Sequence, residues 1–165
     1  MERNTRKAHV FPLGSVYPFF LIHMLAFWVS GFVMAYFSSK SSVGFLYMHG
    51  GIAILVYLVF YKIIFGIDEV KWMVINALLG IFGFYSEIGI LLSFAGKTIS
   101  DYPLYVHVVP FAYYVLYTFL LRQVVLEVTS SRGNEKKSKI VNYAYLGVSL
   151  SVYSLLYLSE RVEFF

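Results

Sequence analysis

Apolar residues occur in long unbroken stretches along this chain, without the alternation that marks a β-strand. Five stretches stand out, at 17–38, 43–66, 70–95, 102–121 and 140–159. A helix crosses the hydrocarbon core of a bilayer with about 20 apolar residues, and each stretch reaches that length. The pattern therefore predicts an all-α integral membrane protein, with five transmembrane helices in one domain that spans residues 1–165.

Short polar connectors rich in glycine, serine and proline separate the stretches, as expected of turns between helices. They are SSKSS (38–42), GIDE (66–69), GKTISDYP (96–103) and TSSRGNEKKSK (129–139). The first stretch ends in FSSKSS and lacks the small-x-small pattern of a cleavable signal, so it is predicted to be a permanent helix. The longest polar segments, 1–16 and 122–139, are too short to form a soluble domain.

Composition supports the membrane assignment. The chain is 59% hydrophobic and 13% charged, whereas soluble domains are about 25% charged. This balance excludes a soluble enzyme, a disordered regulator and a nucleic-acid-binding module. The absence of cysteine excludes disulfides, thiolate metal sites and cysteine nucleophiles. The first partner is therefore the lipid bilayer, and we expect a multi-pass protein of the plasma membrane or an equivalent energy-coupling membrane.

Basic residues predict the orientation, because cytoplasmic loops carry an excess of lysine and arginine. Ten basic residues fall on the side of the amino end and three on the other side. The ten are Arg3, Arg6, Lys7, Lys62, Lys71, Arg122, Arg132, Lys136, Lys137 and Lys139, and the three are Lys40, Lys97 and Arg161. The amino end is therefore predicted to be cytoplasmic and the carboxyl end to lie outside. Tyrosines near the ends of the stretches, such as Tyr36, are expected to serve as interfacial anchors.

Four ionisable residues lie well inside the predicted spans, where such residues usually have a functional role. They are His23, His49, Glu87 and His107. At 1.5 Å per residue, His49 and His107 lie at matched depths of roughly 9 and 8 Å below the outer face, with Glu87 roughly 13 Å below it. His23 lies in the opposite leaflet, and we expect it to make a structural hydrogen bond.

Matched histidines on two helices are typical of a haem held by two imidazoles. Gly50 and Gly51 follow His49 and leave room for a flat macrocycle. Glu87 can hold the second ring nitrogen of a ligating histidine, as carboxylates do around metal sites, or bind a proton or a quinol hydroxyl. The sequence thus predicts His49, His107 and Glu87 as cofactor-binding residues, with His49 and His107 as the metal ligands of haem b.

Three segments, FLYMHGG, NALLGIFGFYSEIGILLSFAG and YPLYVHVVPFAYYVLYTFLL, carry a family resemblance. The run 43–128 resembles one half of the haem A synthase family, a four-helix bundle with a histidine near the outer end of its second and fourth helices. His49 and His107 occupy those places. The resemblance implies a haem-binding core. Leu46 and Gly50 stand where that family usually has a glutamate and an arginine, so only the two histidines are carried over.

The resulting hypothesis is a small cytochrome-like membrane protein that exchanges electrons with quinone or with a partner complex; whether it is an enzyme stays open. One alternative is a non-catalytic subunit or assembly factor of a larger membrane complex, with histidines that only pack. Another is a small proton-coupled transporter that uses Glu87. Gly147, Ser151 and Ser154 form a small-residue stripe on the fifth span, suited to close helix packing within the bundle or against another subunit.

The predicted orientation can be tested by cysteine labelling, since the native chain has no cysteine. A cysteine at position 97 in place of Lys97 should react with an impermeant thiol reagent added outside intact cells. A cysteine that replaces Asn134 should stay unlabelled. The reverse result would invert the predicted topology.

Overall fold

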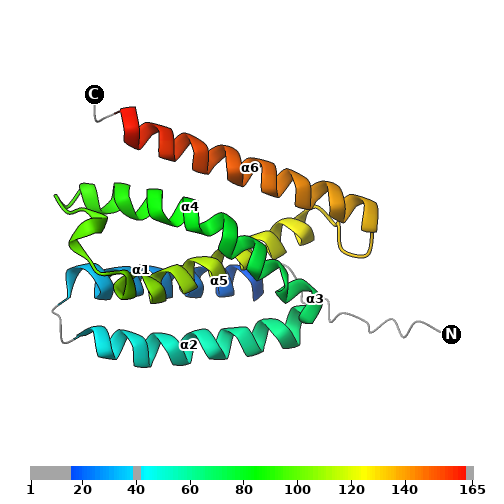
Figure 1. Cartoon of the computed structure of the whole chain (residues 1–165). Helices are drawn as coiled ribbons and strands as arrows, with labels where there is room; N and C mark the ends of the chain where they lie inside the picture. The colour runs from blue at the N-terminus through cyan, green and yellow to red at the C-terminus, as the bar shows by residue number, and fades with distance from the viewer. Residues whose placement is uncertain (1–15, 39–41, 163–165) are drawn as a thin grey trace.

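The computed structural model describes residues 16–38 and 42–162, and this part of the chain is helical and contains no strand (Figure 1). The helices are α1 (Val16–Phe37), α2 (Ser42–Phe65), α3 (Ile67–Val70), α4 (Trp72–Ser93), the 3₁₀ turn η1 (Ile99–Asp101), α5 (Leu104–Val128) and α6 (Glu135–Val162). Arg3, Arg6, Lys7, Lys40 and the side chain of Arg161, which contribute to the predicted orientation, lie outside the described part.

Five candidate membrane spans occur in the described part, which confirms the predicted number. α1, α2, α5 and α6 each form one span, and α3 joins α4 in a single span over Ile67–Ser93. Each is long and apolar enough to cross a bilayer, so the chain is a multi-pass helical membrane protein by this criterion. The first two spans end within one residue of the predicted boundaries.

The predicted boundaries of the last two spans are wrong. α5 continues seven residues past 121, to Val128, and α6 begins at Glu135, five residues before 140. The segment 122–139, predicted to be a long polar connector, is therefore mostly helix. The physical reason is that Arg122, Gln123 and Glu127 have hydrogen-bonding or ionic partners inside the protein, so their polarity does not end the helix.

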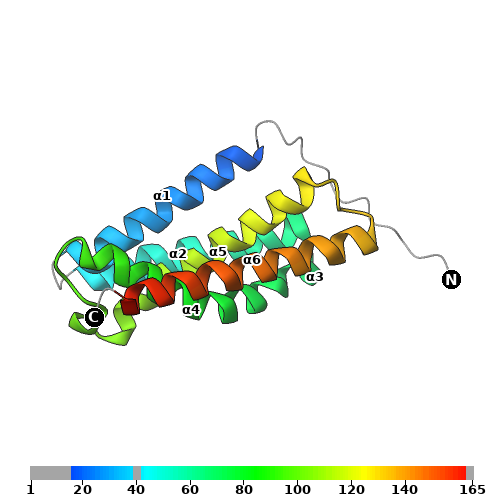
Figure 2. The same cartoon turned by 90° about the horizontal axis from the view of Figure 1, so that it is seen from above.

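The helices are arranged in layers around α5. α6 is the outermost layer and lies against α4, while α2 lies at the opposite edge of the molecule (Figure 1). Seen from above, α1 and α6 lie on opposite sides of α5 (Figure 2). α5 contacts α1, α2, α4 and α6, and it is the most buried of the five spans. The core is thus built on α5.

Aromatic side chains and glycines set the spacing between the helices. Gly31 of α1 accepts the ring of Tyr113, since a Cβ there would lie 2.9 Å from Cδ2 of that ring. Gly50 of α2 packs against Val109, and its Cβ would lie 2.5 Å from Cγ1. Gly83 of α4 accepts the ring of Tyr153 in the same way. These close approaches favour helix association in lipid, where packing rather than water exclusion drives contact.

A charged cluster around Arg122 ties α3, α4 and α6 to the end of α5. The guanidinium is 1% exposed and donates from Nη1 to Glu69 of α3 at 2.8 Å and from Nε to Asn142 of α6 at 3.0 Å. Its carbon Cζ lies 4.1 Å from the ring centroid of Trp72 at the start of α4. Arg122 was predicted to be a connector charge that sets topology, but its contacts make it a buried structural charge.

Arg132 closes the same end of the bundle. It pairs with Glu127 at 2.8 Å and donates to Oε1 of Gln123 at 2.6 Å and to the hydroxyl of Tyr17 on α1 at 3.2 Å. Gln123, which is fully buried, donates in turn to Glu69 at 3.0 Å. α1, α3 and α5 are thereby joined by one network, so the starts of α1 and α6 lie at the same end of the molecule.

We expect Glu69→Gln to destabilise the protein far more than the neighbouring change Asp68→Asn. Glu69 neutralises a buried guanidinium, whereas Asp68 pairs with Lys71 and both of those side chains are more than 70% exposed. Because Glu69 is itself partly exposed, its loss should cost about 2 kcal/mol, between the values for exposed and fully buried pairs. Asp68→Asn should cost at most about 0.5 kcal/mol. Unfolding in detergent measures both, and equal effects would contradict a structural role for Arg122.

Candidate functional site

His107 lies near the start of α5 and is hydrogen-bonded to α1. Its Nδ1 atom is 2.6 Å from the hydroxyl of Tyr36. The backbone carbonyl of Tyr36, near the carboxyl end of α1, accepts hydrogen bonds from Lys97 Nζ at 2.8 Å and from the hydroxyl of Tyr102 at 2.7 Å. The last carbonyls of a helix have no partner within it. Tyr36, His107, Lys97 and Tyr102 therefore form a polar cap that joins α1 to α5 and to the loop before it.

His49 has a different environment. Its imidazole is exposed and stacks between two phenylalanine rings, with centroid distances of 6.2 Å to Phe27 of α1 and 5.6 Å to Phe45 of α2. Within the described residues, His49 and His107 share neither a ring contact nor a hydrogen bond. Each packs instead against its own part of α1.

His23 makes the structural hydrogen bond that its position suggested, although its partner is Tyr57 of α2. The two rings also lie 5.9 Å apart between centroids. This contact joins α1 to α2, as Tyr36 and His107 join α1 to α5. Two of the three intramembrane histidines therefore bond to tyrosine hydroxyls on a neighbouring helix.

Side chains occupy one side of the space that the sequence assigns to a haem between α2 and α5, while an added Cβ on Gly51 would meet no atom within 4 Å. The space beside Gly50 and Gly51, predicted to receive a macrocycle, is occupied on the Gly50 side by Val109, with the Tyr113 hydroxyl 3.4 Å from the position of an added Cβ. Among the described residues, no group of three or more histidines, aspartates or glutamates could hold a metal ion. Ligation of haem b by His49 and His107 remains a prediction.

Glu87 lies away from both histidines, in the contact between α4, α5 and α6. It is half-buried, and the Tyr114 hydroxyl is 3.4 Å from its Oε1 atom. The same hydroxyl is 2.6 Å from that of Tyr153 on α6. An intramembrane carboxyl group beside two phenols can hold or pass a proton, so Glu87 is a candidate proton site rather than a partner of His49 or His107 in this arrangement.

Sequence reasoning missed the tyrosines that complete these sites. Tyr36 was assigned to interfacial anchoring, and Tyr57, Tyr114 and Tyr153 were given no role. The available signal was their depth, because a tyrosine well inside a span must place its hydroxyl against a polar partner. Which partner it contacts depends on which helix faces are in contact. In spans that are apolar on all sides, the spacing of apolar residues does not indicate those faces.

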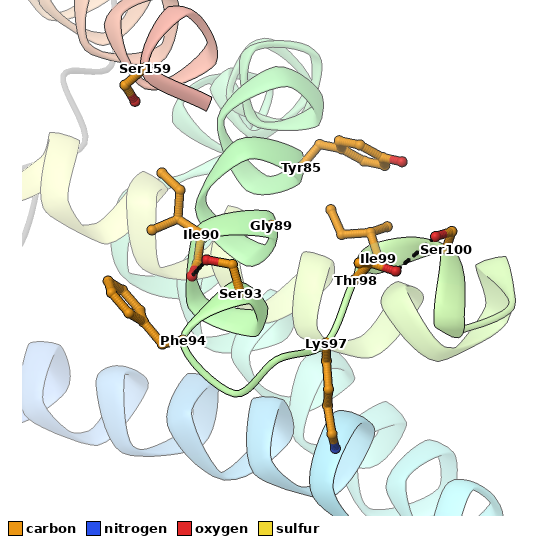
Figure 3. A pocket seen from close by; sticks show the side chains of 10 residues that line it. All are labelled: Tyr85, Gly89, Ile90, Ser93, Phe94, Lys97, Thr98, Ile99, Ser100 and Ser159. Carbon is orange, nitrogen blue, oxygen red and sulfur yellow. Dashed lines mark hydrogen bonds between the residues drawn. The ribbon is translucent and has the colours of Figure 1, made fainter. Parts of the chain in front are cut away.

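Two pockets lie near the same end of the bundle as the cap. A pocket of about 200 Å³ is lined by His107 together with apolar and aromatic residues of α4 and α5: Ile81, Phe84, Tyr85, Leu104, Val108 and Phe111. A larger one, of about 540 Å³, lies between the end of α4, the following loop and Ser159 of α6 (Figure 3). Its lysine, Lys97, points away toward α1 (Figure 3).

The serine and threonine hydroxyls of the larger pocket already have partners. Ser93 and Ser159 donate to carbonyls of their own helices at 2.7 and 2.8 Å, and Thr98 and Ser100 bond to each other at 2.8 Å. No charged group points into it from the residues that line it. The pocket therefore offers little that would recognise a polar ligand.

The chain matches no protein-family model, no curated protein and no solved structure in the three comparisons made. The roles of its residues are therefore inferred from geometry alone.

We expect Tyr36→Phe to destabilise the protein by about 0.6–1.7 kcal/mol, from the average to the maximum measured for intramembrane hydrogen bonds. The change removes the bond to His107 and keeps the ring. Tyr85→Phe is a matched control, because its ring is 59% exposed and no hydrogen bond of its hydroxyl occurs in the described part. Unfolding in detergent compares the two. A haem absorption band that His49→Ala or His107→Ala abolishes would instead support the predicted ligation.

Proposed function

We propose that this protein is a helical subunit of a larger membrane complex and that α6 is the helix that meets the partner. The observation that carries the proposal is a mismatch in α6. It has the lowest mean hydropathy of the five spans and also the smallest buried share. A helix that faces lipid on most sides should instead be among the most apolar. α6 therefore has the composition of a helix with neighbours on two sides.

A stripe of small residues runs along the side of α6 turned away from α4 and α5, beside exposed bulky residues such as Val148 and Leu155. We call Ala144, Gly147, Ser151 and Ser154 the outer face of α6; all four are exposed, and a Cβ on Gly147 would meet no atom within 4 Å. The opposite side carries the residues that contact the bundle, such as Asn142 and Tyr153. The small-residue stripe noted in the sequence thus points outward.

Other spans expose large apolar side chains, and so does α6 beside its outer face, at Val148 and Leu155. Ile22 of α1, Leu55 of α2 and Leu78 of α4 are each more than 60% exposed, as suits contact with acyl chains. Small residues spaced by three and four positions permit close approach of a second helix. Their spacing follows a heptad, which favours a left-handed crossing of about 20°.

The proposal also accounts for the histidines without a redox role. His23 and His107 join α1 to its neighbours through tyrosine hydroxyls, and His49 packs between phenylalanines. The predicted haem requires both imidazoles on one iron, and in the described part of the chain His49 and His107 make no contact with each other. A packing role uses the contacts that each histidine already makes.

The test is Ser151→Leu, which places a bulky side chain on the outer face of α6. Ser30→Leu on α1 is the matched control. Both serines are exposed, and both donate to a carbonyl of their own helix, at 2.8 Å for Ser151 and 2.9 Å for Ser30. In native membranes extracted with mild detergent, the wild type and Ser30→Leu should migrate in an assembly well above the 19.0 kDa of the chain. Ser151→Leu should migrate as a smaller species.

Two results would contradict the proposal. Migration of the wild type as a single chain would show that α6 has no stable partner. An assembly that contains only copies of this chain would replace the distinct partner by self-association.

A further inference from the structure

Asn76 of α4 is a buried amide with no hydrogen-bond partner among the described residues. It is 3% exposed, and neither its nitrogen nor its oxygen bonds to a group in residues 16–38 or 42–162. The Nη2 atom of Arg122 is also buried and has no partner in that part of the chain. A polar group left unpaired in an apolar medium loses the hydrogen bonds that water would give it, and this loss destabilises the fold. Within a membrane no bulk water is at hand, so these groups require a partner from inside the protein.

Contacts along α4 and α5 locate Asn76 between two polar levels. Trp72, one turn before it, lies beneath Arg122, with 4.1 Å between Cζ and the ring centroid. Gly80, one turn after it, faces Tyr114, whose Cε1 would be 3.1 Å from an added Cβ. Because the two helices run antiparallel, Asn76 lies at a level between Arg122 and Tyr114. Trp72, Asn76 and Gly80 are spaced four residues apart, so each is about 6 Å from the next along α4.

α6 contributes a polar group at each of these levels. Asn142 accepts from Arg122 at 3.0 Å, the Tyr145 hydroxyl donates to the carbonyl of Thr118 at 3.2 Å, and the Tyr153 hydroxyl is 2.6 Å from that of Tyr114. We call this column, from Arg122 past Asn76 to Glu87, the polar seam. It follows the contact of α4, α5 and α6.

Glycines on α4 shape the inner end of the polar seam. Asn76, Gly80, Gly83 and Glu87 recur at intervals of four, three and four residues, so they share one face of α4. Gly80 and Gly83 accept the rings of Tyr114 and Tyr153. The two hydroxyls thereby reach Glu87, with 3.4 Å between the Tyr114 oxygen and Oε1.

We propose that the polar seam binds water at Asn76 and provides a proton path between the charged end of the bundle and Glu87. A buried water makes about three hydrogen bonds, and the Asn76 amide and Nη2 of Arg122 supply the unpaired donors and acceptor that such a water needs. Asn76 and Glu87 are eleven residues apart on α4, about 16 Å along the helix, so the path from Asn76 to the tyrosine hydroxyls needs a chain of several waters. The proposal does not depend on a partner for α6.

The proton transfer uses groups already in contact. The Tyr114 hydroxyl donates to the Tyr153 oxygen at 2.6 Å, so both hydroxyls first rotate. A proton that arrives from water is then accepted by the Tyr153 oxygen as that hydroxyl donates its own proton to Tyr114. Tyr114 then donates to Oε1 of Glu87, which turns the carboxylate into a carboxylic acid. The described groups that face Glu87 are Tyr114 on α5 and Tyr153 on α6. The reverse sequence returns the proton to the water chain.

Cysteine accessibility tests for the water, and the cysteine-free chain makes it a clean measurement. Asn76→Cys is compared with Leu78→Cys, two residues away on the exposed side of α4, where Leu78 is 68% exposed. The variants are placed in lipid nanodiscs and treated with a small charged methanethiosulfonate. Only an ionised thiol in contact with water reacts, so Asn76→Cys should react at least about tenfold faster than Leu78→Cys. Equal, slow labelling of the two positions would overturn the proposal.

A cysteine at position 87 tests whether the water path extends to Glu87. Glu87→Cys should also react, and adding Asn76→Leu to it should slow the reaction about tenfold, since leucine fills the same volume and binds no water. Reaction at position 76 without reaction at position 87 would overturn the proton path. Reaction at position 87 that Asn76→Leu leaves unchanged would also overturn it, because water would then arrive by another route. Thr118→Cys, on α5 beside the polar seam, repeats the measurement if Glu87→Cys does not fold.

Discussion

The position of one charge, Arg122, constrains much of this bundle. A guanidinium cannot be left unpaired inside a membrane protein without a large loss of solvation, so the chain must bring a carboxylate to it. That carboxylate is on α3, the four-residue helix that follows the left-handed turn at Gly66, where φ is 86°. The break between α3 and α4 is therefore explained by the need to place Glu69 against α5. The same charge draws Asn142 and Trp72 to it and so positions the starts of α6 and α4.

At the opposite end of the bundle, hydrogen bonds without a buried charge pair connect the helices. There the backbone carbonyl of Tyr36 accepts hydrogen bonds from Lys97 and Tyr102, and the Tyr36 hydroxyl bonds to His107. Tyrosine suits this purpose because its ring packs like an apolar side chain while its hydroxyl reaches a polar partner. Aromatic contacts fill the interior between the two ends, for example between Tyr61 and Phe119 at 5.2 Å. The bundle thus has polar connections at both ends and aromatic packing between them.

The number of spans and the bounds of the first two could be predicted because length and hydropathy determine them. The side of each span that packs against a neighbouring helix could not be predicted. α1, α2 and α5 are apolar on nearly all sides. Their apolar residues therefore do not cluster on one face of the helix, and the sequence does not indicate which face contacts a neighbour. The depths of His49 and His107 followed from residue counts, but the directions of their side chains did not, and His49 meets Phe27 where a haem was predicted. Arg122 was misread for a related reason, since a charge near a span end normally lies in a connector.

The contrast between α5 and α6 shows why composition has to be read together with burial. Both carry polar residues inside an apolar span, and in α5 these residues are buried with partners: Arg122 pairs with Glu69 and Gln123 with Arg132. On α6, Asn142 and Tyr153 are satisfied in the same way, whereas Ser151 and Ser154 lie on the exposed side. Ser151 bonds only to the carbonyl of Gly147 within its own helix. Such a bond makes serine tolerable in lipid, but it does not explain why small residues recur in a stripe beside exposed bulky residues such as Val148 and Leu155. A second helix on that side does explain it, because small residues let backbones approach closely.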